Sequence, residues 1–437
     1  MTLHQPLQWH SCCIAIPWSD IILIITLNKH PLEKFMISVI EAHQILHENM
    51  PVPVTEIVGL ADAHLRRLSD DIEAPESSPR YTNSAMDGFA VRWEDCSEAS
   101  SDHPVCLKVI GESQAGIPFK GIITSSSAIR ISTGAMLPEG ADTIVRVEDT
   151  RENGENVEIL SVKTKGQDVR YEGEEFKKGT RLFSKGMVLG ARELALLAAV
   201  GQYTVPVYAP PKVAILVTGT ELAPPDTTDI KSHQIRDSNS IMLAAAVRES
   251  GAHISSISHI KDSLEQTIEA VKNASMTGNR IILCSGGVSV GKHDHVKEAA
   301  LTAGFKELFW KIRQKPGKPL FVCRLEGTLL FGLPGNPVSA FMCFINYVRP
   351  VLAELQGVES IHHSITAKTI KRVSNTGSRT NFIRVTVENK PNKLAVITEM
   401  TQQGSHMLST IVHADGYIVL EPGQILEPES LVEVFLF

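Results

Sequence analysis

With 437 residues, the chain is too long for one ordinary hydrophobic core and should fold into several domains. Apolar residues make up 43% and charged residues 21%, and the formal net charge of -7 argues against a general nucleic-acid binder. The seven cysteines are scattered without a CxxC pair, so neither a zinc knuckle nor a disulfide framework is indicated, and a reduced, cytoplasmic setting fits best.

The beginning of the chain does not fit the pattern of the rest. Its apolar run, residues 21–27, is far shorter than the roughly 20 residues that a membrane-spanning helix needs. A signal peptide would need a basic start and a small-residue cleavage site, and neither is clear. We expect residues 1–31 to be a disordered extension, with an organelle-targeting segment as the alternative and Met36 as an alternative start.

Helical periodicity over residues 32–49 predicts a helix that ends before Pro51 and Pro53. Short runs rich in Val and Ile follow, separated by turn residues, and they predict a small all-β unit. These runs are residues 89–93, 105–110, 128–132, 143–147 and 157–162. A helix over residues 193–200, closed by Gly201, follows the β unit.

Beyond Pro210 and Pro211, strand-like and helix-like runs alternate. We expect strands at residues 213–217, 254–260, 280–284, 308–313 and 329–333, and helices at 240–249, 263–274, from about 294, and at 338–355. This order predicts a mainly parallel sheet with helices on both faces, where ligands bind at the carboxyl ends of the strands. Residues 361–437 return to short strands and predict a β-barrel or sandwich.

Two glycine-rich turns, SGGVSVGKHD (residues 285–294) and LPGNPVS (residues 333–339), each lie between a strand-like and a helix-like run. Such turns point backbone N–H groups at anions, although a purely structural turn could use the same residues. In the second turn, Pro334 and Pro337 stiffen the backbone and Gly335 permits close approach. No GxGxxG or Walker pattern is present, which disfavours dinucleotide binding and P-loop hydrolysis.

A basic segment lies between the two glycine turns. Read as a strand, it would pack one set of side chains inward and place three cations on the other face. The inward set is Leu308, Trp310 and Ile312, and the cations are Lys311, Arg313 and Lys315, with Lys318 following. A charge run is usually a solvated face, but the neighbouring anion turns favour contact with a small anionic ligand.

Three acids follow successive predicted strands: Glu221, Asp262 and Asp294. Taken singly, each is most simply a loop residue or a helix-capping partner. Taken together, they would converge at one edge of the sheet and repel one another unless a cation such as Mg²⁺ lay between them. In the β-rich part, Asp87 and Thr133 lie in turns that pattern alone does not distinguish from ordinary loops.

In combination, the motifs resemble one family. SAMDGFAV, ISTGAMLPEGADTIVRVEDT, TGTEL, IRDSNS, SGGVSVGKHD, KPGKP and LPGNPVSA occur in the order found in the molybdopterin molybdenumtransferases. These are the MoeA proteins of bacteria and the E domains of plant and animal homologues, gephyrin among them. The resemblance covers nearly everything from Met36 to Phe437.

The resemblance implies a multidomain fold of class α/β plus β. Residues 32–80 with 163–209 would form a discontinuous helical/β part, and residues 81–162 an inserted β domain. Residues 210–357 would form a three-layer α/β/α molybdopterin-binding domain, and residues 358–437 a C-terminal β-barrel. The family forms homodimers with a shared active site, to which Asp87 and Thr133 would contribute in trans.

The implied activity is the final step of molybdenum cofactor biosynthesis: molybdenum from molybdate enters adenylylated molybdopterin, with Mg²⁺-dependent release of AMP. A separate adenylyltransferase would supply the substrate, and molybdoenzymes or cofactor carriers would accept the product. Carried onto this chain, the catalytic residues are Asp87, Thr133, Glu221, Asp262 and Asp294, of which Glu221, Asp262 and Asp294 bind the metal. The substrate-binding residues are Ser285, Gly286, Gly287, Ser289, Lys311, Lys315, Lys318, Pro334, Gly335, Asn336, Pro337, Ser339, Arg384 and Ser409.

Two alternatives remain at this point. A MogA-like molybdopterin adenylyltransferase shares the two glycine turns but usually lacks the β-rich insertion and the barrel. A gephyrin-like scaffold without catalysis could lose the acids and lysines without penalty, whereas this chain keeps them.

Overall fold

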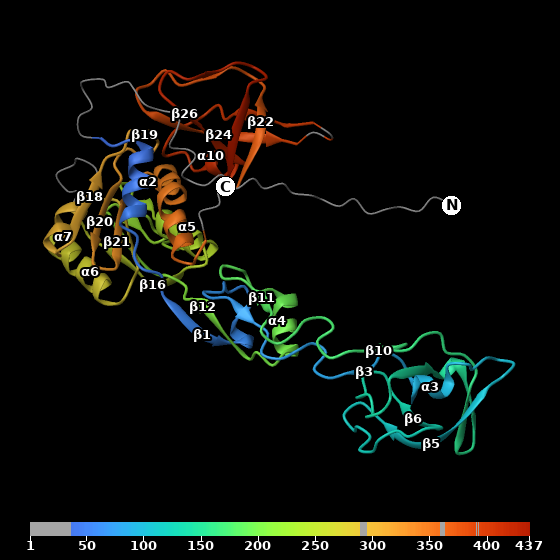
Figure 1. Ribbon diagram of the computed structural model, residues 1–437. Helices are drawn as coiled ribbons and strands as arrows, with labels where there is room; N and C mark the ends of the chain where they lie inside the picture. The colour runs from blue at the N-terminus through green and yellow to red at the C-terminus, as the bar shows by residue number, and fades with distance from the viewer. Residues whose placement is uncertain (1–35, 289–294, 359–362, 390, 392) are drawn as a thin grey trace. The chain divides into compact units, whose positions relative to one another are not determined.

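A computed structural model describes residues 36–437 except 289–294, 359–362, 390 and 392 (Figure 1). The chain divides into two compact units, Met1–Thr55 with Tyr208–Phe437, and Glu56–Val207. The expected extension at residues 1–31 lies outside the described residues. Among the helices of the described part, none has the length and apolar character needed to cross a membrane.

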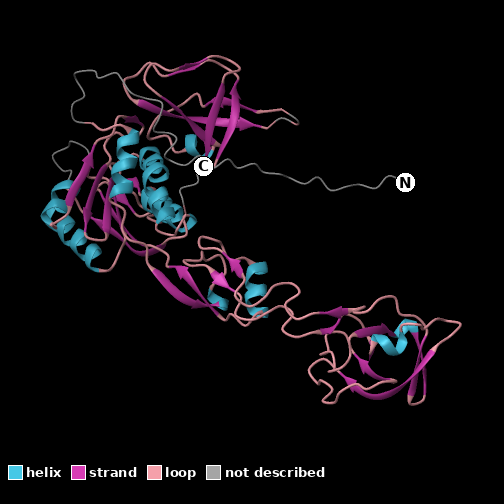
Figure 2. Cartoon of the chain, in the orientation of Figure 1, coloured by secondary structure: helices cyan, strands magenta, loops and turns pink. Residues whose placement is uncertain are grey.

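The Glu56–Val207 unit is dominated by strands (Figure 2), as the sequence predicts. Its six-stranded sheet has the order β7-β4-β6-β5-β9-β8. The strands contribute buried side chains to two apolar clusters, Phe89 and Val145 to one and Ile129 to the other. These strands are β4 (Gly88–Val91), β5 (Val105–Ser113), β6 (Ser127–Ile131), β7 (Thr143–Arg146), β8 (Thr150–Asn153) and β9 (Asn156–Ile159). The small helix α3 (Trp93–Cys96) follows β4.

The same unit contains a second apolar cluster, to which both Leu68 and Val205 contribute from distant parts of the sequence. Three two-stranded sheets, β1-β12, β3-β10 and β2-β11, and helix α4 (Ala191–Ala199) belong to this part. The strands are β1 (Thr55–Gly59), β2 (Ile72–Glu73), β3 (Asn83–Ser84), β10 (Val169–Arg170), β11 (Arg181–Phe183) and β12 (Thr204–Tyr208).

The other unit contains a six-stranded sheet of order β16-β13-β17-β21-β20-β18. All its strands except β20 run in one direction. The strands are β13 (Lys212–Thr218), β16 (His253–Ile260), β17 (Ile281–Ser285), β18 (Lys306–Trp310), β20 (Phe321–Leu325) and β21 (Thr328–Leu333). A further short pair joins β14 (Leu222–Ala223) to β15 (Ile235–Arg236). The predicted mainly parallel sheet is therefore confirmed.

Helices cover both faces of this sheet (Figure 1). On one face, Val213 and Ile215 of β13 pack in a cluster with Leu243 of α5 and Val338 of α8. On the other face, Ala214 packs with Val271 of α6 and Val296 of α7. The helices are α2 (Val39–Glu48), α5 (Asn239–Glu249), α6 (Leu264–Met276), α7 (Val296–Thr302), α8 (Pro337–Cys343) and α9 (Arg349–Glu354). The three-layer α/β/α architecture follows from this alternation of buried faces.

The C-terminal residues form a closed barrel, because β24 pairs with both β25 and β26 in the ring β24-β25-β22-β28-β26. Its strands are β22 (Ser364–Thr369), β24 (Thr380–Glu388), β25 (Ala395–Glu399), β26 (Gly416–Leu420) and β28 (Leu431–Leu436), with a short pair β23 (Val373–Ser374) and β27 (Ile425–Leu426). Ile383, Val385 and Ile418 are in its core. The predicted barrel is confirmed, and β19 (Gln314–Lys315) pairs with β24 from outside the ring.

Two predicted elements are wrong in their extent. The expected helix over residues 338–355 is interrupted by a π-helical segment, η3 (Phe344–Val348), because Pro350 has no N–H for a regular helical bond. The expected strand over residues 308–313 ends at Trp310, since Lys311 adopts a positive φ of 69°. Within the strand, Phe309 is buried, whereas Leu308 and Trp310, which the sequence predicts to face inward, are half-buried.

Candidate functional site at the carboxyl edge of the sheet

The parallel strands end in register at one edge of the sheet, which we call the carboxyl edge. Thr218 is paired with Ile260, and Ser285 is paired with both Val217 and Leu333. The loops after β13, β16, β17 and β21 therefore begin side by side. These loops carry the residues that the sequence singles out at positions 221, 262, 286–287 and 334–337.

The first two acids lie against the same pair of loop residues. Asp262 Oδ2 accepts hydrogen bonds from the Thr220 backbone N (3.0 Å) and from its Oγ1 (2.9 Å). The Glu221 carboxylate lies beside Gly219, since a Cβ on Gly219 would lie only 2.8 Å from Glu221 Oε2. Both carboxylates are thus held at the Gly219–Thr220 dipeptide, where their charges can act on one ligand.

The predicted three-carboxylate metal site is not fully covered by the structure. Asp294 lies outside the described residues, as does Ser289. Among the residues that are described, no three His, Cys, Asp or Glu side chains form a metal-binding group. The oxygen chemistry of Glu221 and Asp262 suits Mg²⁺, so the assignment of the metal site remains a prediction.

The two glycine turns lie next to each other. Gly286 donates its N–H to Leu333 O (3.2 Å) and has a φ of 89°. A Cβ at that position would lie 2.7 Å from Thr218 O, so only glycine lets the turn pass this close to β13. A Cβ on Gly335 would in turn lie 3.8 Å from Gly286 Cα, an ordinary contact that places the two turns side by side.

Asn239 joins the two turns, a role that the sequence analysis did not predict. Its buried Nδ2 donates to Ser285 Oγ and to Gly335 O, both at 2.8 Å. The sequence identified this residue only as part of the IRDSNS motif at a helix start. A polar residue at the first position of a buried helix was the available signal, because its side chain must find partners inside the protein.

The basic segment leaves the sheet at the same edge. Trp310, the last residue of β18, is paired with Phe321, which is paired with Gly332 near the end of β21. Lys311 turns back so that its Nζ lies 3.9 Å from the Trp310 ring centroid, a cation–π contact. Lys315 is exposed and lies opposite Asn381 of the barrel strand β24. Lys318 is exposed as well.

Arg384 is the unusual residue of the barrel. It is 0% exposed and lies on the same face of β24 as Phe382, which packs with the α/β domain, whereas Ile383 and Val385 face the barrel core. Its Nη2 donates to Gly404 O (3.5 Å), but Nε and Nη1 are buried without an acceptor in the described part of the chain. Desolvation lowers the pKa of Arg384 from its ordinary value. A buried guanidinium of this kind is well suited to an anion.

A loop of the barrel connects Arg384 to the second glycine turn. Ser405 Oγ accepts from Asn336 Nδ2 (3.1 Å), and Ser405 O accepts from the Val338 backbone N (3.2 Å). Gly404, the preceding residue, contacts Arg384. Ser409 begins the short helix α10 (Ser409–Val412) and is exposed. The structure thus brings the glycine turns, Ser405 and Arg384 into one continuous chain of contacts.

Asp87 and Thr133 meet in the other unit. The Thr133 backbone N donates to Asp87 Oδ1 (2.8 Å), and both residues are exposed. They lie next to paired residues of the sheet, since Gly88 of β4 is opposite Ile131 of β6. Two separate turns of the sequence therefore form one polar site.

Comparison with known proteins decides the family. Residues 37–201 match the MoeA N-terminal region (domains I and II), residues 214–354 a probable molybdopterin-binding domain, and residues 366–437 the MoeA C-terminal region (domain IV). The molybdopterin molybdenumtransferase 2 of Mycobacterium tuberculosis is 35% identical over 88% of this chain and 92% of its own length. The chain belongs to the molybdopterin molybdenumtransferases. The Bacillus subtilis member is 35% identical over 84% of this chain and 86% of its own.

Solved structures agree with this assignment to the molybdenumtransferase family. The chain resembles the MoeA protein of Pyrococcus horikoshii with a TM-score of 0.80 and 31% identity, over 92% of this chain and 99% of that one. A second structure of a MoeA protein from that organism gives a TM-score of 0.71 at 28% identity. The resemblance that the sequence motifs indicate is therefore confirmed along with the fold class.

Proposed function

We propose that this molybdenumtransferase carries out the final step of molybdenum cofactor biosynthesis. It would insert molybdenum from molybdate into adenylylated molybdopterin and release AMP. The observation that carries the proposal is the fully buried Arg384, two nitrogens of which have no partner among the described residues, joined through Gly404 and Ser405 to the second glycine turn of the carboxyl edge. The relatives' name, molybdopterin molybdenumtransferase, supports the transfer of molybdenum to molybdopterin.

The site has separate groups for two anions. Backbone N–H groups of Gly287 in the first turn and of Gly335 and Asn336 in the second would hold the phosphates, together with Lys311. Lys315, Lys318 and Arg384 would receive molybdate, because three cations can neutralise a tetrahedral dianion and the ligand's oxygens can accept their hydrogen bonds. Ser409 would add a hydroxyl donor from α10.

Glu221 and Asp262 would hold Mg²⁺, with Asp294 as the third carboxylate. The fit rests on the two described carboxylates, which lie at the same dipeptide and offer the hard oxygen donors that this ion prefers. When bound, Mg²⁺ would neutralise charge on the phosphoanhydride that joins AMP to molybdopterin. The two hydrogen bonds from Thr220 orient the Asp262 carboxylate in the ligand-free protein.

We also propose that the enzyme acts as a homodimer in the cytoplasm. Asp87 and Thr133, already joined by a hydrogen bond, would then serve the active site of the second copy. A separate molybdopterin adenylyltransferase would supply the substrate, and molybdoenzymes or cofactor carriers would receive the product.

The test is a single-turnover assay with purified protein, adenylylated molybdopterin, molybdate and Mg²⁺. AMP and molybdenum-loaded molybdopterin should appear together, and omission of Mg²⁺ should abolish both. Formation of adenylylated molybdopterin from ATP and molybdopterin would instead indicate the adenylyltransferase alternative. Absence of either reaction in a folded protein would leave only the scaffold and would overturn the proposal.

A further inference from the structure

The basic segment is folded around one buried amide, that of Gln314, which is 0% exposed and lies between the half-buried Arg313 and the exposed Lys315. Its Nε2 donates to Pro316 O (3.1 Å) and lies 3.4 Å from Gly317 O. These contacts close the backbone between Lys315 and Lys318 into a tight turn. The conformation of the turn therefore depends on where the Gln314 amide is held.

The turn is packed closely against helix α8. A Cβ on Gly317 would lie 2.5 Å from Gln314 Nε2 and 2.6 Å from Cys343 Sγ, so even a methyl group has no room there. Burial raises the pKa of the Cys343 thiol and keeps it a neutral, inert neighbour. The backbone that carries the two lysines thus rests directly on the core of the α/β domain.

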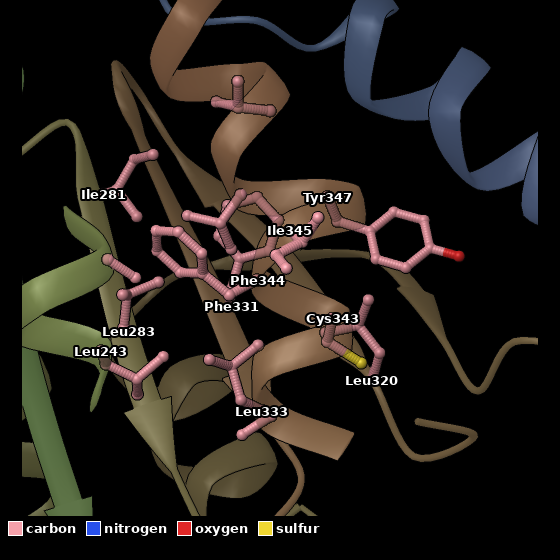
Figure 3. Close-up of a cluster of buried hydrophobic side chains, with 14 of the residues drawn as sticks. Leu243, Ile281, Leu283, Leu320, Phe331, Leu333, Cys343, Phe344, Ile345 and Tyr347 are labelled. Carbon is pink, nitrogen blue, oxygen red and sulfur yellow. The ribbon is translucent and has the colours of Figure 1, made fainter. Parts of the chain in front are cut away.

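Tyr347 fixes the other end of the Gln314 amide. Its hydroxyl donates to Gln314 Oε1, inside the protein where both groups are fully buried. Figure 3 shows the Tyr347 ring leaving the apolar cluster with its oxygen at the far end. The residue belongs to the π-helical segment η3, in which the preceding Asn346 accepts a hydrogen bond from Tyr417 of the barrel (2.9 Å). Two consecutive residues of η3 therefore contact different parts of the protein: Asn346 contacts the barrel and Tyr347 contacts the basic segment.

We propose that Tyr347, through Gln314, is a positioning residue that sets the affinity of the basic segment for an oxyanion. The proposal rests on the proposed function, in which Lys315 and Lys318 receive molybdate. A lysine side chain is flexible, so the position of its ammonium group depends on how firmly the backbone that carries it is held. If the turn is already ordered in the free protein, binding does not have to order it, and the affinity is not reduced by that loss of conformational entropy.

The contacts of Gln314 with the barrel extend the same argument to Arg384. Arg379 Nη1 donates to Gln314 O (3.2 Å), and the Thr380 backbone N donates to Arg313 O (3.0 Å). Both barrel residues precede Arg384 on or beside β24. A displaced Gln314 would therefore shift the lysines relative to the guanidinium that is to share their ligand.

Two substitutions test the proposal, with a matched control. Tyr347→Phe removes the hydroxyl and keeps the ring, and Gln314→Met removes the amide at nearly constant length. Thr328→Val is the control: it deletes another buried hydroxyl bond, from Thr328 Oγ1 to Asn279 O (2.7 Å), at the opposite end of β21. All three should lose some thermal stability, but only the first two should change the anion site.

The readouts are the Kd of sodium molybdate by calorimetry and the steady-state constants of the insertion assay. We expect both test variants to bind molybdate about tenfold more weakly, the ratio that corresponds to one lost buried hydrogen bond. KM for molybdate should rise to match, with kcat and the KM for adenylylated molybdopterin unchanged. Thr328→Val should keep the wild-type Kd.

The outcomes separate this inference from the proposed function. A wild-type protein that binds no molybdate would contradict the proposed function itself. Wild-type binding with an unchanged Kd in folded Tyr347→Phe would overturn the positioning role alone, and so would an equal loss of affinity in Thr328→Val. Should Gln314→Met fail to fold, Tyr347→Phe still decides, because it leaves the Gln314 amide and its two backbone contacts in place.

Discussion

Replacing Arg384 with methionine should stabilise the ligand-free protein. The guanidinium is fully buried and two of its nitrogens have no acceptor in the described part of the chain. Removing the desolvated guanidinium should raise the free energy of unfolding by about 2 kcal/mol. The loss of packing contacts by the shorter methionine side chain should lower it by about 1 kcal/mol. A net gain of about 1 kcal/mol corresponds to a rise of about 2–4 °C in Tm for a unit of this size.

Molybdate should reverse that order of stability. An anion present at 100 times its Kd stabilises the native state by about 2.7 kcal/mol. Arg384→Met should lack most of this stabilisation because it binds molybdate weakly, so the wild type becomes the more stable protein when molybdate is present. Thermal unfolding of both proteins with and without molybdate measures the two effects, with Arg384→Lys as a variant that keeps the charge but loses the planar donor fork. A destabilised Arg384→Met protein that still gains the full increment from molybdate would refute our account of this residue.

Three further predictions concern other parts of the molecule. Asp262→Asn can still accept a hydrogen bond from the Thr220 N–H, so the variant should fold. Its half-maximal AMP release should need at least about tenfold more Mg²⁺, because an amide is a weaker ligand for this ion than a carboxylate. An unchanged Mg²⁺ dependence would exclude the Asp262 carboxylate as a ligand. Gly286→Ala should push the turn away from Thr218 O and slow AMP release about 100-fold, and normal turnover would show that the turn does not hold the substrate. Arg146 hydrogen-bonds both oxygens of Asp168 and lowers its pKa, so Asp168→Asn should cost stability at pH 7. That cost is fully present above the ordinary aspartate pKa and should be lost as the pH falls through the lowered pKa of folded Asp168, because protonation removes the same charge from the wild type. Urea unfolding with a cost independent of pH would contradict this assignment.

The sequence predicts the carboxyl edge well because the physics there is local. Apolar runs of four or five residues, such as residues 213–217 and 281–284, are too short for helices and are rich in Val and Ile, which predicts buried strands. Once the strands are parallel, their loops must emerge at one edge. The positions of Glu221, Asp262 and the glycine turns on that edge follow from topology alone.

The interior contacts of the site could not be predicted in the same way. Alternation along β24 places Arg384 on the face of Phe382, but the pattern does not show that this face packs against another domain. The π-helical segment lies just before Pro350, which lacks the N–H of a regular helical bond, and it contains Tyr347, whose hydroxyl donates to Gln314. Such contacts join residues more than thirty positions apart, and no periodicity encodes them.

The charge of the chain explains why the anion site must be built from short-range contacts. A protein with a net charge of -7 offers no general attraction to a dianion, and charges beyond about 8 Å are largely screened at physiological salt. Attraction must therefore come from the few cations within contact distance, and exposed Lys315 and Lys318 are individually weak partners in water. A guanidinium in the protein interior interacts far more strongly, because less solvent competes for it. Arg384 is buried with no carboxylate partner among residues 36–437 that the structure describes, which lowers the stability of the free protein and leaves the guanidinium available to the ligand.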